Sequence, residues 1–369
     1  MLYHLLTPLS NEATFFNVFR YISFRVAWGM VTALSLCYVL FPPFIRWMRQ
    51  QRMEQIIRAE GPQSHLETKV GTPTMGGIPM LTAIVVSTLL WARLDNAPIW
   101  MALTILVAYG AIGFVDDWKK VMQRSSDGLS ARWKLGGQFG IAALVLGIGY
   151  ATGHLDPALA VPFFKGATIH FDRLIPSATW LGWVYVAIGT FVLAGCSNAV
   201  NLTDGLDGLA IGPVMTSAMT LAILAYLAGH AQFSEYLQIP YVAGAGELSV
   251  FAVCIVGAGL GFLWYNSYPA QIFMGDVGSL ALGGALAIVA VLCKHEILLA
   301  LIGGIFVLEA VSVILQVASF KLTGKRIFAM APIHHHYEKK GWSEPKIIVR
   351  FWIISIMLAL VALSTLKVR

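Results

Sequence analysis

Long apolar runs are the feature that most constrains the fold of this 369-residue chain. Several approach or exceed the about 18–20 residues that cross a bilayer core roughly 30 Å thick. Because lipid offers the backbone no hydrogen-bond partner, such runs must be helices unless they close into a barrel. A barrel would show alternating segments of about 10 residues, which the chain lacks. With 57% hydrophobic residues, 12% charged residues and a mean hydropathy of +0.73, an all-α, polytopic integral membrane protein is predicted.

We predict ten transmembrane helices within a single integral membrane domain, residues 1–369. Pro42-Pro43 is expected to end the first span, because proline disrupts a helix interior. Asp95-Asn96 marks a tight turn between the second and third spans, and Lys294-His295-Glu296 a polar break between the eighth and ninth. The predicted spans are residues 20–44, 75–92, 98–115, 135–151, 179–198, 208–228, 247–265, 278–293, 297–320 and 348–366.

The distribution of Lys and Arg indicates how these spans are oriented. Sixteen of the 25 basic residues fall in loops on one side, and eight fall on the other. Cytoplasmic loops carry the excess of Lys and Arg, so both termini are predicted to be periplasmic. Arg20 and Arg25, which precede the first span, favour the opposite orientation. The net charge of +6 therefore reflects topology and does not indicate a nucleic-acid partner. The absence of Lys and Arg from residues 1–18 argues against a cleavable signal peptide. The predicted cytoplasmic loops lie near residues 45–74, 116–134, 199–207, 266–277 and 321–347.

Polar clusters interrupt the apolar chain on the predicted cytoplasmic side. Loops 199–207 and 266–277 contain no Lys or Arg and carry Asp residues instead. An ionisable group at a membrane edge is costly, which favours a site for a cation, a proton or a charged substrate. The four clusters are Asp116-Asp117 at the end of the third span, Asn201 with Asp204 and Asp207, Asn266 with Gly275-Asp276-Val277-Gly278-Ser279, and Pro332-Ile333-His334-His335-His336-Tyr337-Glu338.

The chemistry of the clusters is complementary. Five carboxylates at one face suit a hard divalent cation, since Mg²⁺ prefers one or two carboxylates together with phosphate oxygens and water. Glycines beside the Asp residues let the backbone approach phosphates closely. The histidines can neutralise or protonate a phosphate. Together the clusters predict a phosphoryl-transfer site at the cytoplasmic surface.

Each cluster has a simpler interpretation when it is taken alone. An Asp-Asp pair at a helix end is more often a solvated terminus than a ligand pair, and Asp-Gly pairs usually mark turns. Three adjacent histidines cannot all face one metal from a loop, so at least one is structural or donates a hydrogen bond. Glu309 and Gln316, within the ninth span, either bind substrate or form interhelical hydrogen bonds. Lys119 and Lys120 are interpreted as a solvated basic loop rather than as an attractor of anionic substrate.

The motifs also resemble those of a known family. Asp116-Asp117, the stretch 201–208, the stretch 275–279 and His334-His335-His336 resemble the polyprenyl-phosphate N-acetylhexosamine-1-phosphate transferase superfamily. Within it, the chain resembles the phospho-N-acetylmuramoyl-pentapeptide transferase family. That closer likeness rests on Pro332-Ile333-His334-His335-His336-Tyr337-Glu338 and Lys69-Val70-Gly71-Thr72-Pro73-Thr74-Met75-Gly76-Gly77. It covers nearly the whole chain, in motif order and in the ten-span layout.

The resemblance implies a reaction and a setting. Phospho-MurNAc-pentapeptide passes from UDP-MurNAc-pentapeptide to undecaprenyl phosphate, giving lipid I and UMP in the first membrane step of peptidoglycan synthesis. Mg²⁺ is the implied cofactor. The implied protein is a ten-helix enzyme of the bacterial inner membrane, commonly a homodimer, with a cytoplasmic active-site cleft and a lateral groove for the lipid.

The resemblance also implies roles for particular residues. Asp276 is the expected Mg²⁺ ligand, with Asp116 as the base for the lipid phosphate and Asp117 as a positioning or metal-side residue. At the nucleotide end, Phe273 would stack on uracil and Asp207 would accept from its ring N–H. The full nucleotide-end set is Lys69, Asn201, Asp204, Asp207, Asn266 and Phe273. The histidines would bind the pyrophosphate or sugar, with His335 counted among the catalytic residues and His334 and His336 among the binding ones.

Two mechanisms and two other functions remain as alternatives. Direct in-line attack by the lipid phosphate, with Mg²⁺ offsetting charge on the leaving UMP, is favoured, and a covalent phospho-aspartate is its rival. The nearest other function is a sibling enzyme that transfers GlcNAc-1-phosphate from UDP-GlcNAc. A divalent-cation or proton-coupled transporter would carry its acidic residues at mid-membrane depth, whereas these cluster at one face.

Overall fold

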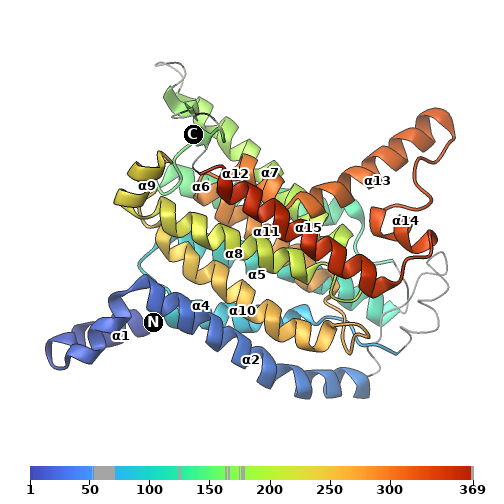
Figure 1. Ribbon diagram of the computed structural model, residues 1–369, viewed down its shortest axis with the longest axis horizontal. Helices are drawn as coiled ribbons and strands as arrows, with labels where there is room; N and C mark the ends of the chain where they lie inside the picture. The colour runs from blue at the N-terminus through green and yellow to red at the C-terminus, as the bar shows by residue number, and fades with distance from the viewer. Residues whose placement is uncertain are drawn as a thin grey trace.

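The protein is a bundle of long helices, seen in the computed structural model of Figure 1. The structure describes residues 1–51, 53, 71–123, 125, 127–162, 164, 167–173, 175 and 179–366. Within these ranges, nine helices are long and apolar enough to cross a membrane, which confirms the all-α, multi-pass prediction. They are α2 (Ile22–Gln50), α5 (Ala97–Gln123), α6 (Ala131–Ala151), α7 (Gly182–Thr203), α8 (Ile211–Ala228), α10 (Leu248–Asn266), α11 (Gly275–Leu292), α13 (Gly304–Thr323) and α15 (Glu344–Ser364). The apolar helix α4 (Gly77–Trp91) is shorter, with 15 residues, so the count of ten spans stays a prediction.

Short elements connect the long helices at the two ends of the bundle. A two-stranded antiparallel hairpin joins α6 to α7 and consists of β1 (Ala158–Ala160) and β2 (Thr168–His170). The other short elements are α1 (Leu2–Leu6), η1 (Pro8–Asn11), η2 (Thr14–Arg20), η3 (Phe171–Arg173), η4 (Thr179–Leu181), α9 (Ala231–Leu237), η5 (Ala245–Glu247), α12 (Glu296–Ile302) and α14 (Ile333–Lys339).

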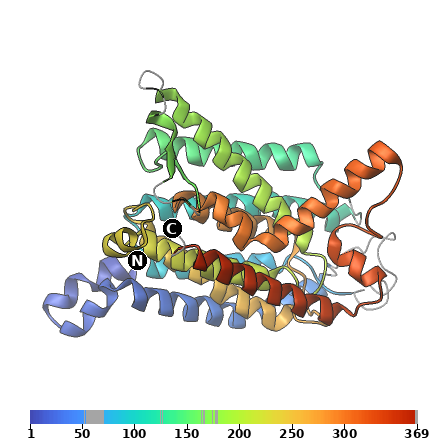
Figure 2. The same cartoon turned by 45° about the horizontal axis from the view of Figure 1, so that its top comes forward.

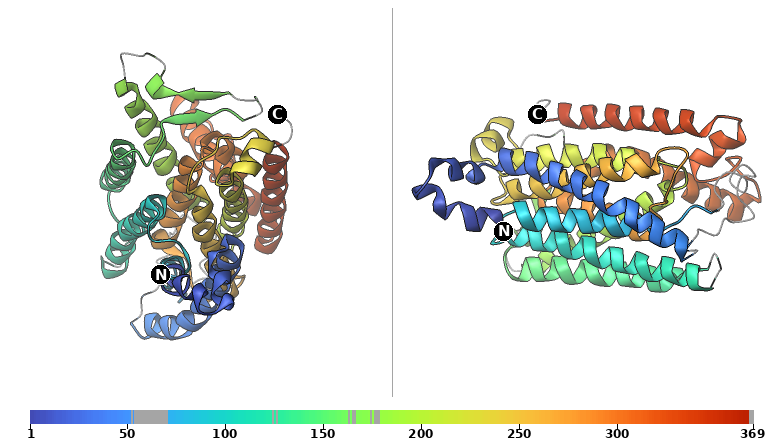
Figure 3. Two further views of the ribbon diagram at one scale, coloured as in Figure 1. Left: turned by 90° about the vertical axis from the view of Figure 1, so that its left-hand side faces the viewer. Right: turned by 90° about the horizontal axis from the view of Figure 1, so that it is seen from below.

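The two ends of the bundle carry different elements. Figures 2 and 3 place α1, α9 and the hairpin at one end and α14 at the other. Helix α15 runs back from α14 and finishes at the end where α1 begins. Helix α13 leans away from the other helices toward α14, as Figures 1 and 2 show. Polar groups near α14 are therefore a bundle length away from those in the hairpin.

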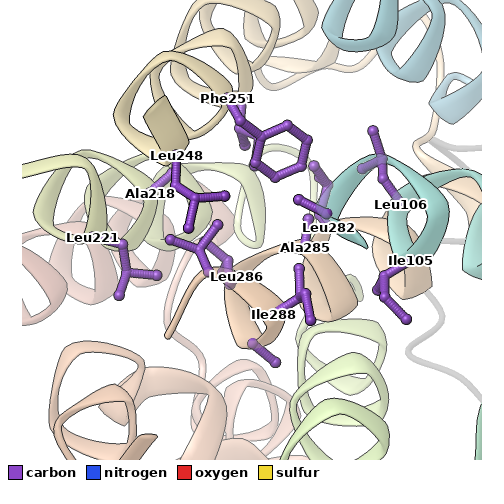
Figure 4. Packing of buried hydrophobic residues seen from close by; sticks show 14 of the residues in the cluster. Ile105, Leu106, Ala218, Leu221, Leu248, Phe251, Leu282, Ala285, Leu286 and Ile288 are labelled. Atoms are coloured by element: carbon purple, nitrogen blue, oxygen red, sulfur yellow. The ribbon is translucent and has the colours of Figure 1, made fainter. Parts of the chain in front are cut away.

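Helix α11 is the centre of the packed core. All its residues from Val277 to Leu292 are buried, and it packs against α4, α5, α7 and α8. A helix that is apolar on all sides is one enclosed by other helices. Figure 4 shows Leu282, Ala285, Leu286 and Ile288 of α11 facing side chains of α5, α8 and α10. The position of the first turn of α11 is thereby fixed by its neighbours.

Glycines bring two neighbouring backbones against that first turn. A Cβ atom on Gly113 of α5 would lie 2.1 Å from the carbonyl oxygen of Asp276. A Cβ atom on Gly77 of α4 would lie 2.3 Å from the amide nitrogen of Gly278. Small residues allow membrane helices to approach this closely. Helices α4 and α5 thus hold the start of α11 by direct backbone contact.

The prediction that Pro42-Pro43 ends the first span is wrong, because α2 continues to Gln50. Pro42 lacks the amide that would bond the carbonyl of Tyr38 in a regular helix. In the structure, the hydroxyl of Tyr265 donates to that carbonyl at 3.3 Å. A hydrogen bond from a neighbouring helix replaces the missing one, which is how membrane helices tolerate proline.

The span predicted at 297–320 is confirmed in part. Helix α13 is one of the membrane-spanning helices, but Gly303 separates it from the short α12. Gly303 lies at φ −89° and ψ 25°, outside helical geometry. The polar break at Lys294-His295-Glu296 is confirmed between α11 and α12, although all three side chains are buried rather than solvated. The turn at Asp95-Asn96 is confirmed between α4 and α5.

We expect Gly113→Ala to destabilise the protein. The added methyl group would force α5 away from the first turn of α11, and overpacking of this kind costs about 1–3 kcal/mol. Gly136 of α6 provides the control, since a Cβ atom there would meet nothing within 4 Å. Thermal unfolding in detergent should show a lower midpoint for Gly113→Ala than for the wild type. The midpoint of Gly136→Ala should not be lowered. Equal midpoints would contradict the close contact.

Candidate functional site

Three carboxylates meet near the end of the bundle that carries α14. Asp116 and Asp117 come from α5, and Asp276 comes from the first turn of α11. One carboxylate oxygen from each residue lies within 4.8 Å of the other two. Helix α5 continues past the Asp pair to Gln123, and both side chains are buried, with 1% and 4% exposed surface. The interpretation of this pair as a solvated helix end therefore does not hold.

Backbone amides and one amide side chain orient these carboxylates. Asp117 Oδ2 accepts the Val277 amide at 3.2 Å. Asn201 Nδ2, in the last turn of α7, donates to Asp276 Oδ1 at 2.8 Å. Gly275 has φ +74°, and a Cβ atom there would lie 2.4 Å from Asp117 Oδ2. The sequence-predicted residues Asp116, Asp117, Asn201 and Asp276 are thus brought together.

Asp116 is held by a different segment, the turn that leads into α6. Its Oδ1 accepts the amide of Leu129 at 2.7 Å. A Cβ atom on Gly128 would lie 2.4 Å from the same oxygen, so the turn backbone presses directly on the carboxylate. The sequence offered no signal for this contact, because Gly-Leu in a polar loop is an ordinary turn pattern.

Two lysines neutralise much of the negative charge. Lys120 Nζ lies 2.5 Å from Asp116 Oδ2, 3.5 Å from Asp117 Oδ1 and 3.2 Å from Asp276 Oδ2. Lys134 Nζ lies 3.2 Å from Asp116 Oδ1 and 2.6 Å from Asp276 Oδ2. The interpretation of Lys120 as a solvated loop residue is therefore wrong. Lys134 was predicted only as part of the basic loop, and it is the clearest functional residue that sequence reasoning missed.

The donor set fits a hard divalent cation. All three groups offer carboxylate oxygens, which Mg²⁺ prefers over the nitrogen and sulfur ligands of softer metals. The lysine ammonium groups contact the same oxygens, so this centre is built to be occupied by positive charge. Asp276, the expected Mg²⁺ ligand, belongs to the cluster and keeps 17% side-chain exposure. Anionic groups of a substrate can compete for the lysines while a metal takes the carboxylates.

A second group of predicted residues joins the loops that follow α7 and α10. Asp207 Oδ2 accepts the amide of Ala270 at 3.0 Å. Asn266 Oδ1 accepts the amide of Gly208 at 2.9 Å, and its Nδ2 donates to a carbonyl at 2.8 Å. Both ends of the buried Asn266 side chain therefore hold backbone. Asp207 and Asn266 fasten the two loops to each other.

Phe273 and Asp204 lie on these same two loops. The Phe273 amide donates to the Pro73 carbonyl at 2.9 Å, and its own carbonyl accepts the Gly76 amide at 2.8 Å. These bonds tie the loop before Asp276 to the segment that begins α4. Asp204 is the residue at which α7 ends, and its side chain is half-buried. Lys69, the remaining residue predicted for the nucleotide end, lies outside the described residues.

The histidine motif forms helix α14 rather than a loop. His334 is buried, and its Nδ1 lies 3.1 Å from Oε1 of Glu309 on α13. A Cβ atom on Gly205 would lie 2.3 Å from His334 Nε2, so His334 packs against the loop that carries Asp204. His334 therefore connects α13 with the end of α7. The contact with Glu309 favours the interhelical interpretation of that glutamate.

The other two histidines face different partners. His335 Nδ1 lies 2.6 Å from Oε2 of Glu338, one turn along the same helix. His336 Nδ1 accepts the amide of Ala329 at 3.0 Å. Gln316 of α13 likewise bonds the loop, since its Nε2 donates to the Phe328 carbonyl at 3.0 Å. The three histidines are distributed over three contacts, as expected for adjacent residues.

The comparisons with known proteins agree with this arrangement. Residues 99–294 match the sequence profile of Glycosyl transferase family 4. The phospho-N-acetylmuramoyl-pentapeptide-transferase of Syntrophus aciditrophicus (strain SB) is 56% identical over 370 residues, covering 100% of both chains. Proteins of the same name are 57% identical in Pelobacter propionicus, over 369 residues, and in Geobacter sp. (strain M21), over 372 residues, again covering 100% of both chains.

We expect Asp276→Asn to weaken binding of a divalent cation at least ten-fold, because one charged ligand of the cluster becomes neutral. Mn²⁺ is a suitable probe, since the paramagnetic resonance signal of the free ion reports its concentration. Asp127→Asn provides the control, because Asp127 is an exposed residue of the α5–α6 loop. Equal affinity of the wild type and Asp276→Asn for Mn²⁺ would contradict the assignment of this cluster as the metal centre.

Proposed function

The chain belongs to the phospho-N-acetylmuramoyl-pentapeptide transferase family, and we propose that it carries out its reaction at Asp116, Asp117 and Asp276. It is a phospho-sugar transferase that moves phospho-MurNAc-pentapeptide from UDP-MurNAc-pentapeptide. The proposed acceptor is undecaprenyl phosphate, and the products are lipid I and UMP. The observation that carries the assignment is the convergence of three carboxylate oxygens within 4.8 Å at one end of the bundle.

Asp276 and Asp117 would hold Mg²⁺, with Asp116 beside them. The bound ion supplies charge neutralisation for the diphosphate and for the leaving UMP. The buried backbone amide of Val277 fixes the orientation of Asp117, and Asn201 fixes that of Asp276. These contacts hold the carboxylates in place before substrate binds, so little reorganisation is needed during the reaction.

Lys120 and Lys134 are proposed to bind phosphate oxygens of the donor. Each ammonium group already contacts Asp276 and Asp116, so each lies at the point where the diphosphate must enter. Positive groups placed where negative charge accumulates stabilise a phosphoryl-transfer transition state. The lysines would therefore bind phosphate oxygens of the nucleotide and of the transferred group.

Direct attack by the acceptor is the proposed mechanism. An oxygen of the lipid phosphate forms a bond to the sugar-linked phosphorus of the donor, and the bond from that phosphorus to the UMP oxygen breaks. Asp116 would take the proton of the lipid phosphate if it arrives as the monoanion. Lys120 contacts all three Asp residues, and Lys134 contacts two of them. These contacts favour direct attack, because a carboxylate oxygen held by an ammonium group is a weaker nucleophile toward phosphorus. The electron pair of the broken bond leaves with UMP.

The nucleotide is proposed to lie toward the loops that follow α7 and α10. Asp207 and Asn266 hold these loops together, and Phe273 is only three residues from Asp276. Phe273 would stack on uracil and Asp207 would accept from its ring N–H, and Lys69, Asn201 and Asp204 are also proposed to bind the nucleotide. His334, His335 and His336 would bind the pyrophosphate or the sugar, and His335 would act closest to the reacting groups.

The lipid acceptor is proposed to reach the site along α13. This helix leans out of the bundle (Figure 1), and it carries many exposed apolar residues. Glu309 is a buried residue of α13, and it contacts the buried His334 of α14. An apolar face that leads to a polar centre suits a long isoprenoid chain with a phosphate head. The exposed apolar residues of α13 include Val307, Leu308, Val311, Ile314, Leu315, Val317, Phe320 and Leu322.

We place the active site at the cytoplasmic face of the bacterial inner membrane, with both termini periplasmic, ten membrane crossings in a single domain and a homodimeric assembly. The excess of Lys and Arg in the loops at the carboxylate end supports this orientation. The common end of α1 and α15 in Figure 3 supports an even number of crossings.

Release of UMP tests the proposed reaction. The purified protein should release UMP from UDP-MurNAc-pentapeptide only when both Mg²⁺ and undecaprenyl phosphate are present. Release without the lipid, together with phospho-sugar trapped on an Asp, would establish the covalent route instead. Equal turnover of UDP-GlcNAc in competition would establish the sibling reaction, and cation flux in proteoliposomes without UMP release would establish a transporter.

We expect Lys134→Met to lower kcat/KM for transfer by about 10–100-fold, the equivalent of the roughly 1.5–3 kcal/mol typical of a charged hydrogen bond. Arg132→Met is the matched control, because Arg132 is an exposed basic residue on the same helix. The comparison is made by initial rates of UMP release. A similar loss of kcat/KM in both variants would show that Lys134 acts only through the positive charge of the basic loop and does not belong to the site.

A further inference from the structure

A second cluster of metal-ligating side chains lies at the opposite end of the bundle. Asp156, His170 and Asp172 each offer one ligand atom within 4.8 Å of the other two. The cluster belongs to the hairpin that joins the last turn of α6 to the start of α7 (Figure 2). Lys134 lies in the first turn of α6, and Asn201 lies in the last turn of α7. The length of these two helices therefore separates this cluster from the Asp276 site.

The hairpin brings the three ligands together. Ala158 pairs with His170, and the amide of Phe171 donates to the Pro157 carbonyl at 3.0 Å. This bond holds the residue after β2 against the segment before β1, which contains Asp156. Asp172 follows within η3, where the chain is no longer extended. The His and the two Asp residues therefore converge where β2 passes into η3.

Two side-chain atoms of these residues have no hydrogen-bond partner within the described part of the chain. They are His170 Nδ1 and Asp172 Oδ1, and both are shielded from solvent. Buried polar atoms are almost always hydrogen-bonded, so two such atoms in one cluster indicate a missing partner. An imidazole nitrogen and a carboxylate oxygen can both coordinate a cation.

The cluster is anchored and borders a cavity. The ammonium group of Lys294, which is 2% exposed, donates to the backbone carbonyl of Asp156. This contact ties the ligand segment to the break between α11 and α12. A cavity of about 340 Å³ lies beside the cluster and is lined by Asp156, His170 and the segment 238–241 after α9. The ligands are thus held by the core on one side and open to water on the other.

We propose that Asp156, His170 and Asp172 form a second metal site, specific for a divalent transition-metal ion and best matched by Zn²⁺. One imidazole with two carboxylates is a mixed donor set that suits Zn²⁺, whereas the all-carboxylate cluster at Asp276 suits Mg²⁺. Three protein ligands would leave the fourth position of a tetrahedral Zn²⁺ site to water. The bound ion would pin the end of β2 and η3 to the segment before β1.

The test uses the purified full-length protein in detergent with Mg²⁺ in excess, so that the Asp276 cluster is saturated. Zn²⁺ binding is measured by equilibrium dialysis, and Co²⁺ is substituted to reveal its ligands by visible absorption. The variants are His170→Gln and Asp172→Asn. His154→Gln is the control, since His154 is an exposed histidine just before the cluster. Asp276→Asn serves to separate the two metal sites.

We expect one Zn²⁺ per chain in the wild type, in His154→Gln and in Asp276→Asn, and at least a ten-fold weaker affinity in His170→Gln and Asp172→Asn. Zn²⁺ should raise the thermal unfolding midpoint of the first three proteins only. Transfer activity in Mg²⁺ alone should be the same in His170→Gln as in the wild type, which shows that the variant is folded. Retention of Zn²⁺ by both His170→Gln and Asp172→Asn, or no Zn²⁺ in the wild type, would overturn the site.

Discussion

Backbone contact between glycines and the first turn of α11 is the constraint on which the site depends. Gly113 and Gly77 bring α5 and α4 against the backbone of Asp276 and Gly278. This contact sets the separation of Asp117 from Asp276, because the two residues lie on the helices that touch. A membrane bundle has little hydrophobic force between its helices, so close packing of small residues has to supply the precision. The geometry of the carboxylate cluster is thus a consequence of core packing.

Charge balance is the second constraint. Three carboxylates whose oxygens lie within 4.8 Å of one another would repel strongly in a buried setting without compensating cations. Lys120 and Lys134 supply two positive charges from α5 and α6, and a divalent ion would turn the remaining single negative charge into a net positive one. Anionic phosphates that enter the site can bond the lysines as the metal bonds the carboxylates. The opposite end of the bundle repeats this logic on a smaller scale, with Lys294 holding the backbone of Asp156.

The lengths of the apolar runs predicted much of the fold, and the errors arose where contacts between distant segments decide the local structure. The apolar runs predicted the long helices, because lipid leaves a backbone no alternative. Pro42 was misjudged because its compensating partner, the hydroxyl of Tyr265, lies on another helix. Within the site, Asp116 and Asp276 stood out as carboxylates in apolar surroundings. Lys134 did not, since a lysine in a basic loop looks ordinary until α6 is packed against α5. Contacts between distant segments were the information that the residue pattern lacked.

Transfer by the Asp276→Asn variant is the most direct test of the account, because Asp276 joins the metal, the lysines and the glycine contacts at one residue. Asparagine preserves the shape of the side chain and removes its charge. We predict that initial rates of UMP release fall to near background while the thermal unfolding midpoint stays within a few degrees of the wild type. Near-normal transfer by a folded Asp276→Asn protein would contradict the claim that the cluster of Asp116, Asp117 and Asp276 is the centre of the reaction.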